Sequence, residues 1–299
     1  MTGSTIPRRG FGRLLRSFRE RSQKSMLTAG LAIDVSPPTI LRLEDGLPSK
    51  ISTPQIERLL DIYQISFAER TEALEMWDLV KRQDKLAKAQ GTSKGWWQGY
   101  SDVYKPYFDH YLRLEAAATH MTSHQLVLMP GILQVPEYRR ALIRTFTPGM
   151  SAVDTERLLE LAARRQARIV DNGLNLVALL SESVLLHQPG GTRVLAEQLR
   201  HLAEISERPN VSIRVIRHSV GTNPGHVVLS FTLLEFPPMA SRLVEPPVVY
   251  IEGAEGALYL ERGDVIDRYR QAISGIQAVA LSEEDTRDLV LRSAKECSA

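Results

Sequence analysis

The sequence has little of what usually places a protein in a class at first sight. A single cysteine, Cys297, stands among 299 residues, so no disulfide can form within the chain. No run of eighteen apolar residues occurs, and the N-terminus lacks the apolar core of a signal peptide. We therefore expect a cytoplasmic protein that does not cross a membrane. Aromatic residues make up only 6%, and the formal net charge is only +2. What remains is an ordinary globular composition, 43% hydrophobic, and a length sufficient for two domains.

Residue patterns typical of catalytic and metal-binding sites are scarce as well. His120 and His124 are four residues apart on an expected helix, but no cysteine or carboxylate joins them at ligand spacing. The segment Ser181–Ser183 precedes His187 without the glycines of a nucleophile elbow. Gly190–Gly191 lacks the lysine and the spacing of a phosphate loop. We therefore expect no enzymatic activity, no bound metal and no cofactor.

The most informative stretch begins at Ser25 and has the pattern of two short helices joined by a tight turn. Ser25 and Ser36 each supply an N-cap hydroxyl, and they are eleven positions apart. This leaves room for about two helical turns, a short connection and a second helix start. Asp34 falls in the turn, where a left-handed backbone is needed, and Pro37 takes the first helical position. Gly30 lies where the helices approach most closely. The spacing predicts a helix-turn-helix.

Apolar residues in this stretch and in its flanks complete a small helical bundle. Apolar spacing predicts one helix over Phe11–Arg19 and another that contains Ile56, Leu59, Leu60 and Tyr63. Within the motif, the positions that two crossed helices would bury are Ala29, Ile33, Val35, Ile40 and Leu43.

Positive charge is concentrated at the same end of the chain. The first fifty residues carry nine basic and four acidic side chains, a net charge of +5, whereas the whole chain carries +2. This asymmetry predicts a basic face that meets a polyanion such as DNA. A solvated basic helix is the other interpretation of the charge alone.

The motif is similar to that of a known family. The segment Val35–Ile40 followed by Leu43-Glu-Asp-Gly46 resembles the Cro-like, xenobiotic-response-element class of helix-turn-helix regulators, and the resemblance covers roughly residues 11–65. Two positions depart from the family pattern, because Met26 stands where Gln is usual and Asp34 where Gly is usual. The resemblance implies binding to double-stranded DNA through the second helix of the motif.

The candidate DNA-binding residues follow from that resemblance. Among them only Arg42 offers a bidentate contact to guanine, while Leu41 or a proline can touch a thymine methyl group. Direct base readout is therefore expected to be sparse, with phosphate contacts and DNA shape carrying more of the affinity. The full set is Lys24, Met26, Ser36, Pro37, Pro38, Thr39, Leu41, Arg42 and Lys50.

The remaining chain predicts a connecting helix and a second domain. An amphipathic pattern over residues 67–88 is followed by a break at residues 90–95, so we expect a DNA-binding domain over 1–68, a connecting helix and linker over 69–95, and a C-terminal domain over 96–299. In the C-terminal domain we expect strands over 177–180, 211–216, 227–236 and 248–251, and helices over 156–169, 192–207, 264–281 and 282–294. Glycines around residues 257–260 suggest a hairpin. The fold class is therefore α+β, with an N-terminal all-α helix-turn-helix bundle and a C-terminal mixed α/β domain.

An aromatic cluster opens the C-terminal domain, although aromatic residues are few elsewhere. Two interpretations remain open: a seam of the core, or the wall of a ligand pocket or partner groove. A loop from His218 to His226 is rich in glycine and can border such a pocket. The candidate ligand- or partner-binding residues are Trp96, Trp97, Tyr100, Tyr104, Tyr107 and His226.

A second resemblance covers this region. Trp96-Trp97, then residues 114–117 and the block Met129-Pro-Gly-Ile-Leu-Gln134, look like the WhiJ-like group of actinobacterial regulators, and the resemblance runs to about Leu281. That group pairs a Cro-like domain with a C-terminal domain of unknown function, sometimes described as antitoxin-like. It implies a small partner protein encoded nearby.

Together these features predict a sequence-specific transcriptional regulator. We expect a homodimer that binds two half-sites. Its C-terminal domain would sense a small-molecule effector or dock a partner protein. The alternatives are an antitoxin-like protein that neutralises a small partner, and an enzyme tethered to DNA.

Overall fold

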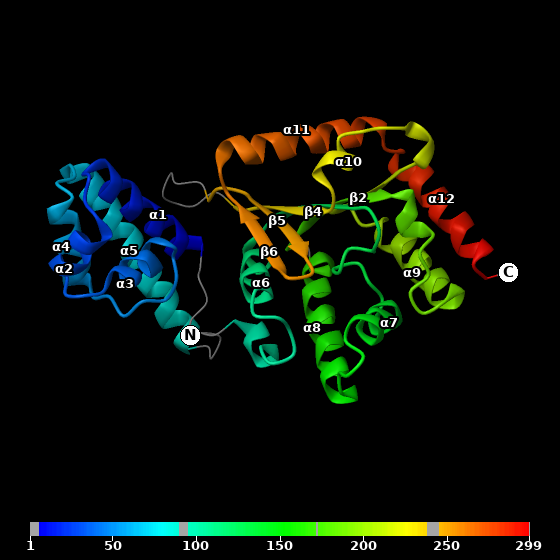
Figure 1. Ribbon diagram of the computed structural model, residues 1–299, viewed down its shortest axis with the longest axis horizontal. Coiled ribbons are helices and arrows are strands. Elements are labelled where there is room, and N and C mark those ends of the chain that lie inside the picture. Colours follow the sequence, from blue (N-terminus) through cyan, green and yellow to red (C-terminus); the bar gives the residue numbers. More distant parts are fainter. Residues whose placement is uncertain (1–5, 90–94, 172, 238–244, 299) are drawn as a thin grey trace. The chain divides into compact units, whose positions relative to one another are not determined.

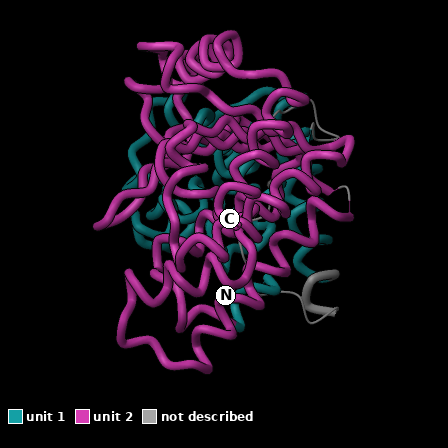
Figure 2. The backbone as a smooth tube through the Cα atoms, turned by 90° about the vertical axis from the view of Figure 1, so that its right-hand side faces the viewer, with its two compact units in different colours: residues 1–99, 237–245 teal, residues 100–236, 246–299 magenta. Residues whose placement is uncertain are grey.

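The computed structural model describes residues 6–89, 95–171, 173–237 and 245–298. It divides into two compact units, shown in different colours in Figure 2. Unit 1 contains residues 1–99 and 237–245, and unit 2 contains residues 100–236 and 246–299. Most of the predicted break at residues 90–95 lies outside the described residues. Within the described part of the chain, none of the helices combines the length and the apolar character that crossing a membrane requires.

Unit 1 is a bundle of helices, and its core comes from the apolar positions that the sequence indicated. Phe11 and Leu15 of the first helix are fully buried, as is Ile40 of the third. The ring of Trp77 lies 5.1 Å from that of Phe11, centroid to centroid, and links the long fifth helix to this core. The helices are α1 (Ile6–Arg21), α2 (Met26–Ala32), α3 (Pro37–Glu44), α4 (Thr53–Ile62) and α5 (Phe67–Ala89).

The helix-turn-helix is confirmed in most of its local detail. One expectation was wrong, because the Ser36 hydroxyl does not cap α3 and instead lies 3.0 Å from the Thr39 hydroxyl oxygen. The Ser25 hydroxyl accepts a hydrogen bond from the Thr28 amide at 3.0 Å and caps α2. Asp34 adopts φ = 57°, the left-handed conformation expected in the turn. A Cβ on Gly30 would lie 2.5 Å from the Val35 carbonyl oxygen, so only glycine allows α2 to approach the turn this closely.

Unit 2 is built on a mixed sheet of six strands, in the order β3-β2-β1-β4-β5-β6. Strands β1, β2 and β3 are mutually parallel, whereas β4, β5 and β6 run antiparallel to their neighbours. Figure 1 shows helices on both sides of this sheet. The strands are β1 (His120–Gln125), β2 (Asn175–Ser181), β3 (Val211–Ile216), β4 (Phe231–Glu235), β5 (Val248–Gly253) and β6 (Gly256–Leu260).

The helices of unit 2 include the four that the sequence predicted, within a few residues at each end. They are α6 (Phe108–Ala117), α7 (Pro136–Phe146), α8 (Ala152–Val170), α9 (Thr192–Ile205), α10 (Gly225–Val228), α11 (Gly263–Val279) and α12 (Glu283–Glu296). Short 3-10 turns cover η1 (Trp96–Tyr100), η2 (Glu182–Leu185) and η3 (His218–Val220). The α+β fold class is therefore confirmed.

The two faces of the sheet differ in character, because successive residues of a strand point to opposite sides. One face packs against α11 through apolar side chains such as Leu179, Leu233 and Val249. On the opposite face lie Ser123 of β1, Thr232 of β4 and Tyr250 of β5, which the strand register places side by side. This second face is polar at its centre.

Two further sequence expectations were wrong. His120 and His124 lie on strand β1, not on a helix, because the six residues pair with strands on both sides. The strand expected over 227–236 begins only at Phe231, since the chain first forms the helical turn α10 and then passes through Leu229 at φ = 57°. In both cases tertiary pairing and a turn overrode local propensity.

His124 is 2% exposed and its Nδ1 lies 3.0 Å from the Leu179 carbonyl oxygen. Burial lowers the pKa of His124 below its ordinary value of 6.5. Below pH 6.5 the unfolded chain therefore binds a proton at His124 more readily than the folded protein does. The contribution of neutral His124 to the free energy of unfolding is complete above pH 6.5 and is lost as the pH falls toward the lowered pKa of the folded state. We expect His124→Asn to reduce this acid-induced loss, measured as the free energy of unfolding at pH 7.5 and about 5. The exposed His187→Asn should leave the loss unchanged, and an equal effect of both substitutions would contradict the assignment.

Candidate nucleic-acid interface and internal cavity

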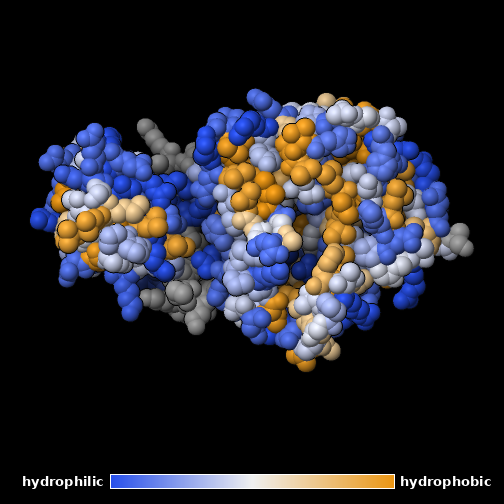
Figure 3. All heavy atoms as spheres, viewed as in Figure 1, coloured by the Kyte–Doolittle hydropathy of each residue, from blue (hydrophilic) through white to orange (hydrophobic). Residues whose placement is uncertain are grey.

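Helix α3 presents a short exposed face. Pro38, Leu41 and Arg42 are exposed on it, whereas Ile40 and Leu43 are buried on the other side. Of the remaining candidate residues, Ser36 and Lys50 are exposed and Lys24, Pro37 and Thr39 are half-buried. Met26 is partly buried and packs against the core of unit 1. Hydrophobic residues are visible on the surface of unit 1 in Figure 3, and Leu27, Leu31 and Leu41 are among its exposed side chains.

A buried ion pair fixes α3 against α1. Arg19 is 8% exposed and Glu44 is 2% exposed. Arg19 Nε donates to Glu44 Oε1 at 2.6 Å, and the second guanidinium nitrogen donates to Oε2 at 2.8 Å. Arg16 adds a longer contact to the same carboxylate at 3.3 Å. Paired forks of this kind set orientation as well as distance, so Glu44 determines how α3 is presented.

The arginines of α1 form less of a basic face than the charge count suggested. Arg8 pairs with Asp84, and Arg9 Nε lies 3.0 Å from Glu245 Oε1 in a contact where both side chains are almost fully buried. Arg13 also donates to Glu245, at 3.0 Å through one nitrogen. Most of the excess positive charge is therefore used inside unit 1, because burying an arginine requires a carboxylate partner.

Arg42 lies at the solvent-facing end of α3. Its guanidinium donates an exposed hydrogen bond to the Pro48 carbonyl oxygen at 3.2 Å, which a phosphate or a guanine edge can replace. Nearby, Ser25 and Thr28 leave the N-terminus of α2 exposed to solvent. Exposed helix N-termini are suited to phosphate contacts.

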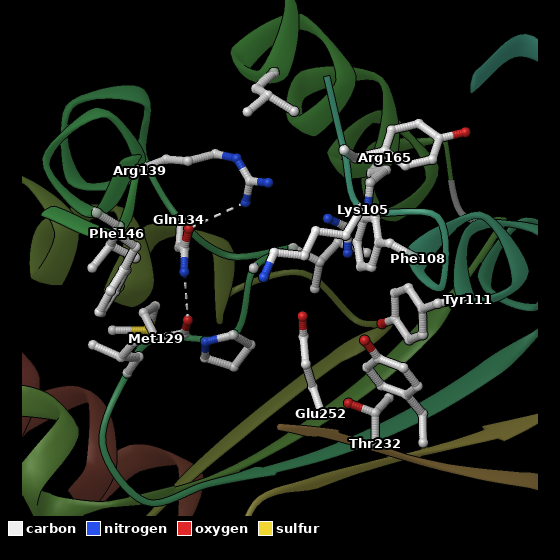
Figure 4. A pocket seen from close by; sticks show the side chains of 18 of the residues that line it. Lys105, Phe108, Tyr111, Met129, Gln134, Arg139, Phe146, Arg165, Thr232 and Glu252 are labelled. Carbon is white, nitrogen blue, oxygen red and sulfur yellow. Dashed lines mark hydrogen bonds between the residues drawn. The ribbon is translucent and has the colours of Figure 1, made fainter. Parts of the chain in front are cut away.

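Unit 2 contains a cavity of about 560 Å³ between the polar face of the sheet and α6, α7 and α8. Figure 4 shows side chains from these elements converging on it. Its walls combine apolar and aromatic side chains with a substantial set of polar groups. The lining includes Tyr104, Tyr107, Phe108, Tyr111, Met129, Leu142, Phe146, Met150 and Leu158 on the walls, with Lys105, Ser123, Gln134, Arg139, Arg165, Thr232, Tyr250 and Glu252 as polar groups.

Two guanidinium groups meet at the upper wall of the cavity. A Cβ on Gly131 would lie 3.6 Å from Arg139 and 3.7 Å from Arg165, so the two cations flank this glycine. Arg165 is held by Glu115 through hydrogen bonds of 2.7 Å from both Nε and a terminal nitrogen. It also lies 5.4 Å from the Phe108 ring centroid. Although burial opposes its charge, the Glu115 carboxylate raises the pKa of Arg165 above the ordinary value.

Arg139 has no such carboxylate. One terminal nitrogen donates to Gln134 Oε1 at 3.3 Å, and its Nε is enclosed without a hydrogen-bond partner among the described residues. Burial, with the nearby charge of Arg165 as a second cause, lowers the pKa of Arg139 to about 10. Arg139 therefore stays charged at neutral pH, next to another cation.

The loop over 129–135 forms one wall of the cavity and is held firmly. Gln198, fully buried, accepts from the Val135 amide and donates to the Leu133 carbonyl, both at 2.8 Å. Gln134 donates to the Met129 carbonyl at 2.8 Å. The cavity wall is thus preformed, which is common in small-molecule sites.

Comparison with known families gives one match in the N-terminal part of the chain and one in the C-terminal part. Residues 11–73 match a family model described as a helix-turn-helix domain, and residues 108–292 match one described as a domain of unknown function, DUF5753. The second match covers more than half of the chain. The protein belongs to the DUF5753 family. Its helix-turn-helix domain indicates DNA binding. No curated protein and no solved structure matches the chain.

The aromatic residues that the sequence singled out do not form one site. Tyr104 and Tyr107 line the cavity of the DUF5753 domain. Trp97 and Tyr100 are each 7% exposed, and neither is part of the cavity lining. Trp96 is half-buried and packs edge-on against Trp97. His226 is exposed at α10 and lies outside the cavity lining. The two interpretations of the aromatic cluster thus each describe part of it.

Sequence reasoning missed the polar groups of the DUF5753 cavity. One signal was present, because Arg165 occupies the buried stripe of α8 together with Leu158, Leu161 and Ile169. A charged residue at a core position of an amphipathic helix indicates a buried partner or a site. Glu252 and Arg139 gave no such signal, since β5 and α7, the elements that carry them, are far apart in sequence.

Proposed function

We propose that the protein is a Cro-like, sequence-specific transcriptional regulator of the WhiJ-like kind, with a C-terminal domain that senses a small molecule. It acts by occupying a promoter site and not by catalysis. The observation that carries the proposal is the helix-turn-helix of unit 1, with α3 braced by Glu44 and its outer face exposed.

The exposed face of α3 supports readout of a major groove. Arg42 is the side chain on that face that can make a bidentate contact to guanine, and Leu41 and Pro38 are placed for apolar contact with thymine methyl groups. The N-terminus of α2 is capped by Ser25 and is exposed to solvent, so it is suited to contact a phosphate group of DNA. One such motif covers a single half-site, so we infer a homodimer on a palindrome whose half-sites are about one helical turn apart.

The cavity supports sensing as the role of the C-terminal domain. Its volume of about 560 Å³ falls in the range of sites for small organic molecules, and it combines apolar walls with converging polar groups.

Replacing Arg42 with alanine should weaken the specific complex by about 1 to 3 kcal/mol, because a bidentate contact to guanine is lost while the fold of α3 is kept. The measurement is a titration of the full-length protein onto its recovered operator, compared with a random duplex of equal length. Affinity for the random duplex should change much less.

The matched control is Arg82→Ala, which removes the same charge from an exposed position on α5. It should leave specific affinity nearly unchanged. If both alanine variants weaken the operator complex equally, or if Arg42→Ala has no effect, Arg42 does not read the bases.

A further inference from the structure

We propose that the cavity of unit 2 binds an organic monoanion, with its carboxylate or similar head on Arg139 and a flat apolar body against the aromatic wall. This inference rests on the sensing role in the proposed function and adds the chemical class of the ligand. It is carried by the geometry at Arg139, Arg165 and Glu252, seen together in Figure 4.

Charge is unbalanced at one end of the cavity. Arg165 is neutralised by Glu115, whereas Arg139 forms no ion pair with a carboxylate among the described residues and is only partly offset by the more distant charges of Glu115 and Glu252. Lys105 is exposed and adds another positive charge from the rim. An enclosed guanidinium costs free energy unless an anion is near, so this end of the cavity is suited to accept an anionic group.

One wall of the cavity suits a flat apolar body. Phe108 and Tyr111 are stacked at 5.2 Å between ring centroids, and the Tyr111 and Tyr250 centroids are 4.3 Å apart, so the three rings form one continuous aromatic surface. Met129 and Met150 contribute flexible thioether side chains to the lining. Aromatic faces and methionines together favour an unsaturated or ring-containing ligand.

The floor of the cavity favours a hydrogen-bond donor on that ligand. Glu252 follows Tyr250 by two residues on β5 and so lies on the same face, and its carboxylate accepts from the Tyr107 hydroxyl at 3.4 Å. Burial, with the charge of Glu252 as a second cause, raises the pKa of Tyr250, so this hydroxyl remains protonated. The Glu252 charge repels a second anionic group. The ligand is therefore a monoanion that also carries a hydroxyl or amine able to donate to Glu252.

The test compares two fluorescent probes that share an aromatic skeleton and an N–H donor but differ in charge. Anilinonaphthalene sulfonate carries one sulfonate, whereas its parent phenylnaphthylamine is neutral. The full-length protein should bind one sulfonate probe per chain, at least about tenfold more tightly than the neutral probe. Affinity and stoichiometry are measured by fluorescence titration with calorimetry.

Variants assign that preference to Arg139. Arg139→Gln should reduce affinity for the sulfonate probe by about tenfold and leave the neutral probe unchanged, while Arg139→Lys should retain part of the preference. Arg140→Gln is the matched control, because Arg140 is the next residue of α7, pairs with Glu137 and Glu156, and is not part of the lining. It should behave as the unmodified protein.

Equal affinities for the two probes on the unmodified protein would overturn the proposal, even if Arg139→Gln fails to fold. So would unchanged sulfonate affinity in a folded Arg139→Gln variant. A DNA titration of the same preparation separates the two hypotheses. DNA binding without probe preference refutes the ligand class alone, whereas probe preference without any DNA affinity refutes the proposed function and leaves the cavity assignment standing.

Discussion

Replacing Glu44 with alanine should lower the free energy of unfolding of unit 1 by about 3 to 5 kcal/mol, because Arg19 would stay buried without its carboxylate. The Arg19 and Glu44 side chains are 10% and 1% exposed and share two short hydrogen bonds, so water can replace little of the lost partner. Hydrogen exchange of amides in α1 and α3, followed by mass spectrometry, reports this loss separately from unit 2. Affinity for the operator should fall together with stability, since α3 loses the ion pair that fixes it against α1.

Asp45→Ala is the matched control for this prediction. Asp45 is the next residue, is exposed, and pairs with Arg16 at the surface. Its removal should change stability by no more than about 1 kcal/mol. Replacing Arg19 and Glu44 together by methionine and leucine should recover much of the loss, because no buried charge is then left alone. Equal losses for the Glu44 and Asp45 variants would refute the role of the buried pair.

Replacing Glu115 with glutamine should destabilise unit 2 by about 3 to 5 kcal/mol. Glu115 and Arg165 are 2% and 4% exposed, and Arg165 also lies against the rings of Phe108 and Tyr111. Without the carboxylate, Arg165 would lose its ion pair while lying next to a second cation, Arg139. Exchange of amides in α6 and α8 measures the loss.

Glu160→Gln offers the comparison on the same helix as Arg165. Glu160 pairs with Arg164 at 2.8 Å, and both side chains are about half exposed. Such surface pairs contribute little, so we expect a change of no more than about 1 kcal/mol. A Glu115→Gln variant as stable as Glu160→Gln would show that Arg165 does not depend on Glu115.

The helix-turn-helix was predictable because its determinants are local. The N-cap at Ser25, the left-handed turn at Asp34 and the close approach at Gly30 each depend on neighbours within about ten residues. The hairpin of β5 and β6 and the start of the last helix at Ser282 were predictable for the same reason, because their signals are also local.

Other parts of the fold depend on partners that are distant in the chain. Strand β1 is rich in polar residues, and its two histidines are spaced as on one face of a helix. It forms a strand only because it pairs with β2 and β4. The charge of α1 looked like a DNA-binding face because its acidic partners Asp84 and Glu245 lie far along the sequence. The cavity was hidden for the same reason, since Arg139, Arg165 and Glu252 come from three separate elements.

Selection of genomic DNA fragments by the full-length protein tests the central claim most directly. We expect enrichment of one short sequence with two inverted half-sites about one helical turn apart, bound with an affinity that falls steeply as salt increases. Failure to enrich any sequence, at low as well as physiological salt, would contradict the conclusion that α3 presents a DNA-reading surface.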